Sequence, residues 1–206
     1  MAVSYLQAAF GDQLPELPFL QEIDRPGLKL LLQMIEKRLN SPLTSSVGRL
    51  FDAVASLIGL RNQVSYEGQA ALELEMLIED DGAEEPAYPF LIADVGNLWQ
   101  VDSTLMIEQL VHDLLNEAAP AQISARFHNG LAQVIVEVCT KIVTMQGPLP
   151  VALSGGVFQN RYLTEWSARL LRQAGFEVLL HRQVPPNDGG LALGQAVVAA
   201  AQFEAR

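Results

Sequence analysis

The chain has 206 residues, of which 50% are apolar and 18% are charged, so a sizeable buried core is expected and wholesale disorder is excluded. A formal net charge of −11 leaves no positive field for a nucleic-acid backbone, and a single cysteine excludes a disulfide framework or a zinc cluster of cysteines. No leader pattern and no apolar run of roughly 18 residues is found, so we expect a cytoplasmic protein that binds neither membrane nor nucleic acid.

The first 85 residues are predicted to be mainly helical. Residues 1–25 contain Pro15 and Pro18 and are expected to form an irregular lead-in. Asp24 before Pro26 predicts a helix start, because an aspartate caps free amides and proline suits a first turn. The expected apolar face of that helix, which ends near 40–42, consists of Leu28, Leu31, Leu32, Ile35 and Leu39.

Two further helices are expected before the composition changes. One runs from about 46 to 58 and stops at Gly59, with small residues that indicate packing on more than one side. The other covers roughly 67–78 and leads into the acidic stretch 79–85, which we expect to be a solvated loop.

The pattern after residue 85 is that of an α/β region. Residues 88–93 and 98–101 read as a hairpin, and helices are expected from about 103 to 116 and from Pro120 onward. The segment from 150 onward alternates between strand and helix, which implies parallel strands covered by helices. Its expected elements are a strand at 150–153, a helix at 160–173, a strand at 176–180 and a helix at 188–201.

The first candidate site is the turn that follows the strand at 150–153. Gly155 and Gly156 let main-chain amides approach an anion without a Cβ in the way, and the following helix aims its positive end at the same place. Asn160, at the opening of that helix, can bond a ribose, a base edge or a phosphate. A tight turn with no ligand explains the glycine pair equally well, and the spacing is not that of a P-loop or a dinucleotide fingerprint.

The second candidate is the Pro-Pro-Asn-Asp-Gly-Gly string at 185–190, which lies between the expected strand at 176–180 and the expected helix at 188–201. Ligands collect at the carboxyl ends of parallel strands, and Asp188 can bind a hard cation there. The alternative is that Asp188 caps the helix and has no ligand. Because the two turns follow adjacent strands, together they favour a binding crevice.

The third candidate is a polar line on the helix at 46–58. Arg49 and Asp52 share a face, so they line a pocket or simply pair with each other. Gly68, near the next helix start, again permits close main-chain approach. We interpret His128 as a packed histidine and Cys139 as inert core, and find no Ser/His/Asp or Cys/His set.

These motifs resemble the last part of the HypF carbamoyltransferases. The likeness covers nearly the whole chain in the same order, and its last two strings are specific. The strings lie at 41–55, 66–71, 125–128, 153–161 and 185–195.

The resemblance implies a fold and a reaction. HypF proteins help to make the cyanide ligands of nickel–iron hydrogenases: they convert carbamoyl phosphate with ATP to carbamoyl adenylate and pass the carbamoyl group to the C-terminal cysteine of HypE. Their transferring domain is similar to TsaD and has the actin-like/sugar-kinase/Hsp70 fold, in which two ribonuclease-H-like lobes close over a nucleotide. We therefore expect residues 86–206 to be a ribonuclease-H-like α/β lobe, residues 1–85 a helical portion of the same partial domain, and the first lobe to be missing.

Site residues carry over by motif. Asp188 matches a catalytic, metal-binding aspartate, and Asn160 an asparagine that contacts the nucleotide or acyl adenylate. Asp52, Gly68 and the pair Gly155 and Gly156 match further ligand-contacting positions. The implied cofactors are ATP, ADP or carbamoyl adenylate and a divalent metal.

The resemblance also implies what the chain lacks. The family's two metal-binding histidines lie in the first lobe, and no such string exists here, so weak metal binding and no turnover in isolation are expected. The expected partners are HypE and the missing lobe or a complementary chain. The alternatives are a non-catalytic nucleotide-binding or assembly module derived from that enzyme, and a related carbamoyl- or threonylcarbamoyl-transferase with another acceptor.

Overall fold

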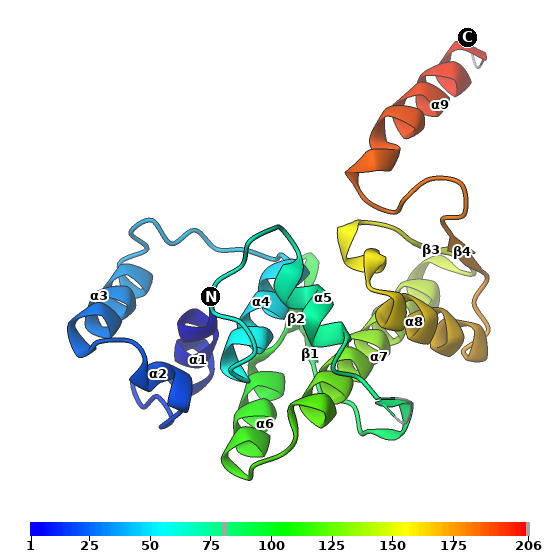
Figure 1. Cartoon of the computed structure of the whole chain (residues 1–206). Coiled ribbons are helices and arrows are strands. Elements are labelled where there is room, and N and C mark those ends of the chain that lie inside the picture. The colour runs from blue at the N-terminus through cyan, green and yellow to red at the C-terminus, as the bar shows by residue number, and fades with distance from the viewer. Residues whose placement is uncertain (80–81, 205–206) are drawn as a thin grey trace. The chain divides into compact units, whose positions relative to one another are not determined.

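The computed structural model describes residues 1–79 and 82–204, and it divides into two compact units, Met1–Val134 (unit 1) and Ile135–Arg206 (unit 2). Helices and strands are mixed, as expected for an α/β protein (Figure 1). The predicted division at residue 85 stays a prediction. The elements of unit 1 are α1 (Ala2–Phe10), α2 (Pro18–Gln21), α3 (Arg25–Glu36), α4 (Val47–Leu57), α5 (Gln69–Glu75), η1 (Gly82–Glu84), β1 (Leu91–Val95), β2 (Leu98–Asp102), α6 (Thr104–Leu115) and the first part of α7 (Pro120–Gln146).

The prediction of an irregular lead-in at residues 1–25 is wrong. Ala2, Val3 and Leu6 are buried on one face of α1, which packs against α4 and α6. Pro15 and Pro18 break only the part that follows, where Pro18 opens the short helix α2. The start of the chain is helical because the apolar side chains on one face of α1 are buried against α4 and α6.

Local capping explains where the next helices begin. The Asp24 carboxylate accepts a hydrogen bond from the Gly27 amide at 3.1 Å, and α3 starts at the following residue, as predicted. The Ser46 hydroxyl accepts one from the Arg49 amide at 3.4 Å, and Gly59, with φ 72°, follows the end of α4. A glycine tolerates this left-handed conformation without steric cost, so it terminates the helix.

The core of unit 1 forms where α4 meets α7. The Phe51 and Phe127 rings pack edge to face with their centroids 4.9 Å apart, and the His128 ring lies 5.2 Å from that of Phe51. His128 is completely buried, and its Nδ1 lies 2.8 Å from the Ser124 carbonyl oxygen. Burial lowers the pKa of His128 to about 4 although the bond to Ser124 opposes the change. The prediction of a packed histidine is confirmed.

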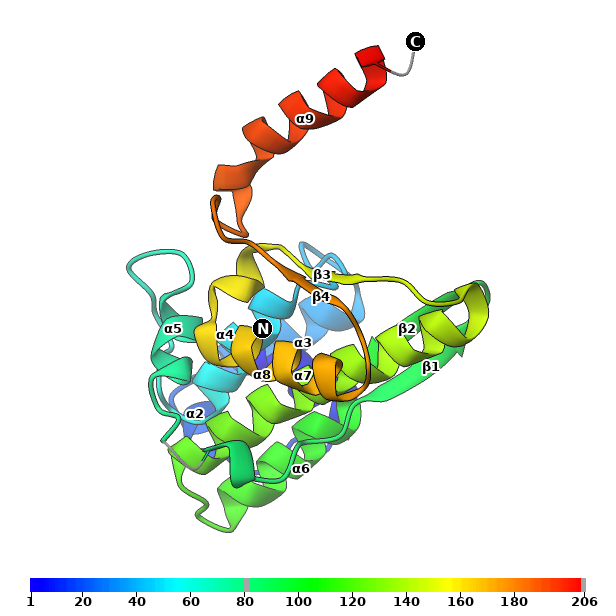
Figure 2. The ribbon, with the colours of Figure 1, turned by 90° about the vertical axis from the view of Figure 1, so that its right-hand side faces the viewer.

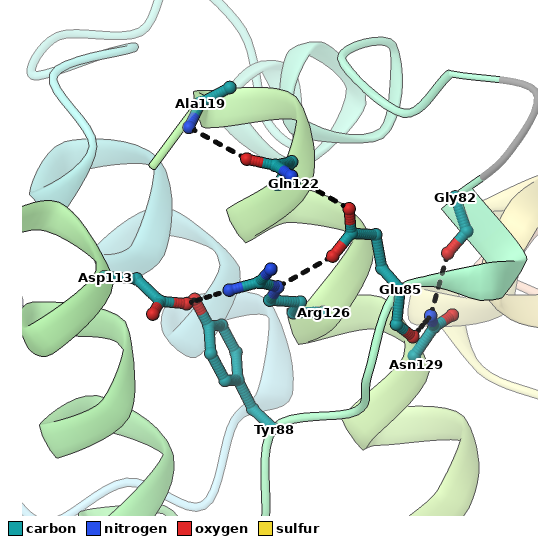
Figure 3. Close-up of polar contacts among 8 residues, drawn as sticks. All are labelled: Gly82, Glu85, Tyr88, Asp113, Ala119, Gln122, Arg126 and Asn129. Atoms are coloured by element: carbon teal, nitrogen blue, oxygen red, sulfur yellow. Dashed lines mark hydrogen bonds and ion pairs between the residues drawn. The ribbon is translucent and has the colours of Figure 1, made fainter. Parts of the chain in front are cut away.

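A polar network ties the segment before β1 to α6 and α7 (Figure 3). Arg126 donates from Nε to Glu85 at 2.8 Å and from Nη1 to Asp113 at 2.7 Å, and Tyr88 donates its hydroxyl to the same Asp113 oxygen at 2.6 Å. Burial lowers the pKa of Arg126, but the hydrogen bonds to Asp113 and Glu85 outweigh it and raise that pKa. The Asn129 amide donates to the carbonyls of Gly82 and Glu85.

Glu85 corrects the prediction of a solvated loop at 79–85. Its carboxylate is bound by Arg126 and also accepts from Gln122 at 3.1 Å, so the end of this acidic stretch is anchored (Figure 3). Gly82 is buried, and Asp80 and Asp81 lie outside the described residues. The run of acidic residues alone did not reveal that Arg126, about 40 positions later, forms an ion pair with Glu85.

The predicted hairpin is present. β1 and β2 pair antiparallel with Val95 opposite Leu98, so the chain reverses at Gly96 and Asn97. Gly130, inside α7, lies so close to the segment ahead of β1 that a Cβ would overlap the Tyr88 carbonyl oxygen. A glycine inside a helix costs about 1 kcal/mol, and here it permits the close approach of two main chains.

Unit 2 contains the predicted strand–helix alternation. Its elements are the second part of α7, β3 (Val151–Leu153), η2 (Gly156–Gln159), α8 (Arg161–Gln173), β4 (Val178–Leu180), η3 (Asp188–Gly190) and α9 (Leu191–Glu204). Leu153, Ala168 and Leu171 form its buried centre, with Ile135 and Cys139 of α7 packed against it. None of the helices in the described parts of the chain is long and apolar enough to cross a membrane.

The buried histidine predicts a pH dependence of stability. The unfolded chain takes up a proton on His128 near pH 6.5, whereas the folded chain does so near pH 4. The free energy of unfolding therefore falls as pH drops through this window, by on the order of 3 kcal/mol. In urea titrations from pH 7 to pH 4, His128→Gln should flatten this part of the curve, whereas the exposed-site control His112→Gln should keep it. An unchanged slope in His128→Gln contradicts the assignment.

Candidate functional site

The candidate site of unit 2 begins with the pairing of β3 and β4. The two strands are parallel, with Val151 opposite Val178 and Leu153 opposite Leu180, and they run side by side in Figure 2. Their carboxyl ends therefore lie at one edge of the sheet. The two glycine-rich turns that the sequence singled out both start from that edge.

A main-chain hydrogen bond joins the two turns. The Gly155 amide donates to the Pro186 carbonyl oxygen at 2.7 Å. Gly155 has φ 107° and ψ 160°, a conformation open almost only to glycine, and nothing lies within 4 Å of where a Cβ would be. The space beside the turn is thus open, and both Gly155 and Gly156 are exposed.

A serine–histidine contact at the same edge was missed by the sequence reasoning. Ser154 follows β3 directly, His181 follows β4 directly, and the Ser154 hydroxyl lies 2.9 Å from His181 Nε2. The signal was present, because the register that places Leu153 opposite Leu180 also places the next two residues opposite each other. Reading the histidines only by their mutual spacing concealed it.

Asn160 has a structural role that any ligand role must share. It is buried, and its side-chain oxygen accepts a hydrogen bond from the Leu163 amide at 2.7 Å, which makes it the N-cap of α8. The predicted position at the helix opening is confirmed. Its contact with a nucleotide stays a prediction.

Asp188 does not cap its helix. The adjacent Asn187 takes that role, since its side-chain oxygen accepts from the Gly189 amide at 3.0 Å. The Asp188 carboxylate is exposed and makes no hydrogen bond or ion pair with the parts of the chain that the structure describes. A carboxylate at the ligand edge without a protein partner suits contact with a cation, and its metal and catalytic roles stay predictions.

The glycines after Asp188 keep this turn tight. A Cβ on Gly190 would lie 3.0 Å from the Pro185 carbonyl oxygen, and one on Gly189 would lie 3.0 Å from the Pro185 ring. The Gly190 amide in turn donates to the Asn187 carbonyl at 3.0 Å. The turn therefore holds Asp188 in one place through main-chain bonds.

The two remaining site candidates belong to unit 1. Asp52 pairs with Arg49 at 3.3 Å, which is the simpler of the two alternatives that the sequence left open. The Arg49 side chain is exposed and that of Asp52 is partly exposed, so the pair contributes little to stability.

Gly68 lies at the start of α5 with φ 80° and open space where a Cβ would be. The loop before it is fixed by Arg61, which donates to both Glu73 oxygens at 2.7 and 2.6 Å. The Gln69 side chain also donates to Glu73 and accepts from the Ser65 amide. The ligand roles of Asp52 and Gly68 stay predictions.

The described residues do not form a complete site for a divalent metal. No group of three or more histidine, cysteine, aspartate or glutamate side chains suited to hold a metal occurs within residues 1–79 and 82–204. Asp188 would supply one ligand. We therefore assign no chemical step to a metal.

The chain was compared with known proteins. A family model described as "Carbamoyltransferase, Kae1-like Domain, second subdomain" matches residues 1–195. The carbamoyltransferase HypF of Synechocystis is 38% identical over 186 residues, which are 90% of this chain and 22% of that protein. A HypF homologue of Cupriavidus necator is 37% identical over 186 residues, which are 87% of this chain and 46% of that protein.

A solved structure is similar to this chain and belongs to the same family. The crystal structure of full-length HypF in its phosphate- and nucleotide-bound form superposes with a TM-score of 0.83 at 39% identity, over 90% of this chain and 24% of that chain. The predicted α/β, TsaD-like fold is confirmed at the level of a Kae1-like carbamoyltransferase domain. This chain spans about a quarter of the length of most of the curated relatives that it matches.

The cap at Asn160 predicts different outcomes for two substitutions. Asn160→Ala should lower the free energy of unfolding by about 1 kcal/mol, because α8 loses its cap, whereas Asn160→Asp keeps an acceptor there and should be less destabilised than Asn160→Ala. Chemical denaturation of both variants measures this. Equal stability of Asn160→Ala and the parent would contradict the cap.

Proposed function

Because the chain belongs to the HypF carbamoyltransferase family, we propose that it supplies one half of the active site of such an enzyme. The half in question is the second subdomain of the Kae1-like domain. Its task is to hold a nucleotide, ATP, ADP or carbamoyl adenylate, on the edge formed by β3 and β4.

The observation that carries this proposal is the hydrogen bond from Gly155 to Pro186. It locks two exposed glycine-rich turns together at the carboxyl edge of a parallel sheet, the position where ligands bind in open α/β sheets. The Gly155, Gly189 and Gly190 amides donate within the turns, and the absent side chains of Gly155 and Gly156 leave room for phosphate oxygens beside the Gly156 amide. A relative of known structure was solved with phosphate and nucleotide bound, which supports the same class of ligand here.

We assign the side chains as follows. Asn160 contacts the nucleotide or acyl adenylate in addition to capping α8. Asp188 faces the reacting end and is the one metal ligand that this chain contributes. Asp52 and Gly68 of unit 1 keep the ligand-contacting roles that the family strings imply.

The proposed reaction is transfer of a carbamoyl group derived from carbamoyl phosphate, by way of carbamoyl adenylate, to the C-terminal cysteine of HypE in nickel–iron hydrogenase maturation. We place it in the cytoplasm. In this scheme the chain's own residues bind and orient the nucleotide, while the first lobe completes the site.

A second candidate is a non-catalytic nucleotide-binding or assembly module. It is favoured by the finding that no group of three or more side chains suited to hold a metal occurs within residues 1–79 and 82–204. The first candidate requires both nucleotide binding and Asp188, whereas the second does not require Asp188.

Nucleotide binding is tested by calorimetric titration of the chain with ADP. Gly155→Ala forces a methyl group into the open side of the turn and should weaken ADP binding about tenfold or more. Gly175→Ala is the matched control: Gly175 also has a positive φ, 89°, and open space, but it precedes β4 and so lies at the other end of the strands. Both variants carry backbone strain, and only Gly155→Ala should lose affinity.

Equal affinities in the two variants, or no heat of binding from a folded parent chain, would contradict the nucleotide site.

The role of Asp188 is tested in an assembled enzyme, in which this chain replaces the matching part of Synechocystis HypF. Asp188→Asn should reduce carbamoyl transfer by about a hundredfold or more, since it removes the charge at the reacting end. Glu177→Gln, which neutralises another exposed carboxylate of unit 2, should leave transfer unchanged. Normal transfer by Asp188→Asn would remove this residue from the mechanism and favour the non-catalytic module.

A further inference from the structure

The contact between Ser154 and His181 is a polar pair that the proposed function leaves unused. The Ser154 hydroxyl oxygen lies 2.9 Å from His181 Nε2, and both residues are exposed. They directly follow β3 and β4, the parallel strands that run side by side in Figure 2. The pair therefore lies at the carboxyl edge of the sheet, where ligands bind in open α/β sheets.

The pair is not part of the buried centre of unit 2. Leu153 lies in that centre and Leu180 packs against it. Because side chains alternate along a strand, the residues that follow, Ser154 and His181, project from the opposite side of the sheet. An exposed hydrogen bond competes with water and contributes little to the stability of the fold. The pair is thus free to serve a ligand.

The hydrogen of the Ser154 hydroxyl can take two places in this contact. In one arrangement the hydroxyl donates to Nε2, and only its lone pairs face the solvent. In the other, Nε2–H of His181 donates to the hydroxyl oxygen, and the hydroxyl hydrogen is free to point outward. A phosphate oxygen is negatively charged and accepts hydrogen bonds, so only the second arrangement can bind it.

A main-chain donor lies on the same turn. Gly156 is the first residue of η2, so its amide has no partner within that helix, and no side chain of its own or of Gly155 stands beside it. The bond from Gly155 to Pro186 fixes the turn that carries both donors. The Ser154 hydroxyl and the Gly156 amide can therefore each donate to oxygens of one phosphate group.

We propose that Ser154 donates its hydroxyl hydrogen to a phosphate oxygen of the ligand and that His181 is the positioning residue for this bond. His181 acts through Ser154: its Nε2–H holds the hydroxyl oxygen and directs the hydroxyl hydrogen outward. The inference rests on the proposed function, because it needs a phosphate group at this edge. It adds two residues to the candidate site, of which His181 lies outside the family strings.

The first test is calorimetric titration of variants with ADP. A hydrogen bond to a charged group is stronger than one between neutral groups, so Ser154→Ala should weaken ADP binding about tenfold. A hydroxyl that nothing holds has about three staggered positions, so His181→Leu should weaken binding about threefold or more. In the Ser154→Ala background, His181→Leu should have no further effect, since no hydroxyl is left to direct.

Two further variants serve as rescue and control. His181→Gln keeps a donor, because an amide nitrogen can take the place of Nε2, so it should lose less affinity than His181→Leu. His112→Leu changes an exposed histidine of unit 1, whose ring contacts Asn116, and should leave the affinity unchanged. Equal losses in His181→Gln and His181→Leu, or a loss from His181→Leu that persists in full without the Ser154 hydroxyl, would overturn the positioning role.

The tautomer of His181 gives a readout that a merely structural contact would not move. At about pH 8, above the ordinary titration range of histidine, the nitrogen resonances of the labelled ring show which nitrogen carries the hydrogen. In the ADP complex of the parent chain the hydrogen should be on Nε2, and in the complex of Ser154→Ala this preference should be lost. A His181 Nε2 without a hydrogen in the parent complex overturns the proposal.

The outcomes separate this inference from the proposed function. If the folded parent chain binds no ADP, the nucleotide site and the role of the pair are both contradicted. If the parent binds ADP and both Ser154→Ala and His181→Leu bind it equally well, only the role of the pair is contradicted. Both residues are exposed, so the variants should unfold at the temperature of the parent. The tautomer measurement on the parent chain decides the matter if a variant does not fold.

Discussion

The parallel pairing of β3 with β4 is the constraint on which the rest of unit 2 depends. Three residue pairs fix the register, and that register sets which residues of the following turns face each other. It brings Ser154 to His181 and lets the Gly155 amide reach Pro186, so two segments some 30 positions apart act as one surface. The strand pairing and the bond from Gly155 to Pro186 are main-chain contacts, and the Ser154–His181 contact between side chains adds to them. A single-residue slip of the register would separate the turns.

Two residues at this edge are used in different ways by the fold. Asn160 is buried and caps α8, so the ligand role proposed for it has to be compatible with this structural one. The Asp188 carboxylate is exposed and makes no hydrogen bond or ion pair within the described residues, and Asn187 caps the turn instead.

Capping and spacing predicted most elements, because these are local signals. Asp24, Ser46, Gly59 and Pro120 define helix boundaries through contacts with residues a few positions away. What failed was set by distant partners: α1 forms because it packs on α4 and α6, and Glu85 is anchored by Arg126. The Ser154–His181 contact was hidden for the same reason, since only the strand register reveals it.

The candidate site was predictable in part. Both glycine-rich turns and the residue Asn160 could be located from the strand-to-helix pattern and from the family strings, and the structure joins the turns at one edge. Which of Asp188 and Asn187 caps the turn could not be told from adjacent residue types, because both can accept an amide hydrogen bond. The roles of Asp52 and Gly68 rest on the family strings alone.

The most direct test of the central claim is a map of amide resonances of the chain during titration with ADP. If the two joined turns hold the nucleotide, the largest shifts should fall on the amides of Gly155, Gly156, Gly189 and Gly190, four glycines that the spectrum can distinguish by substitution. Shifts elsewhere, or none from a folded chain at saturating ADP, would contradict a nucleotide site on this edge.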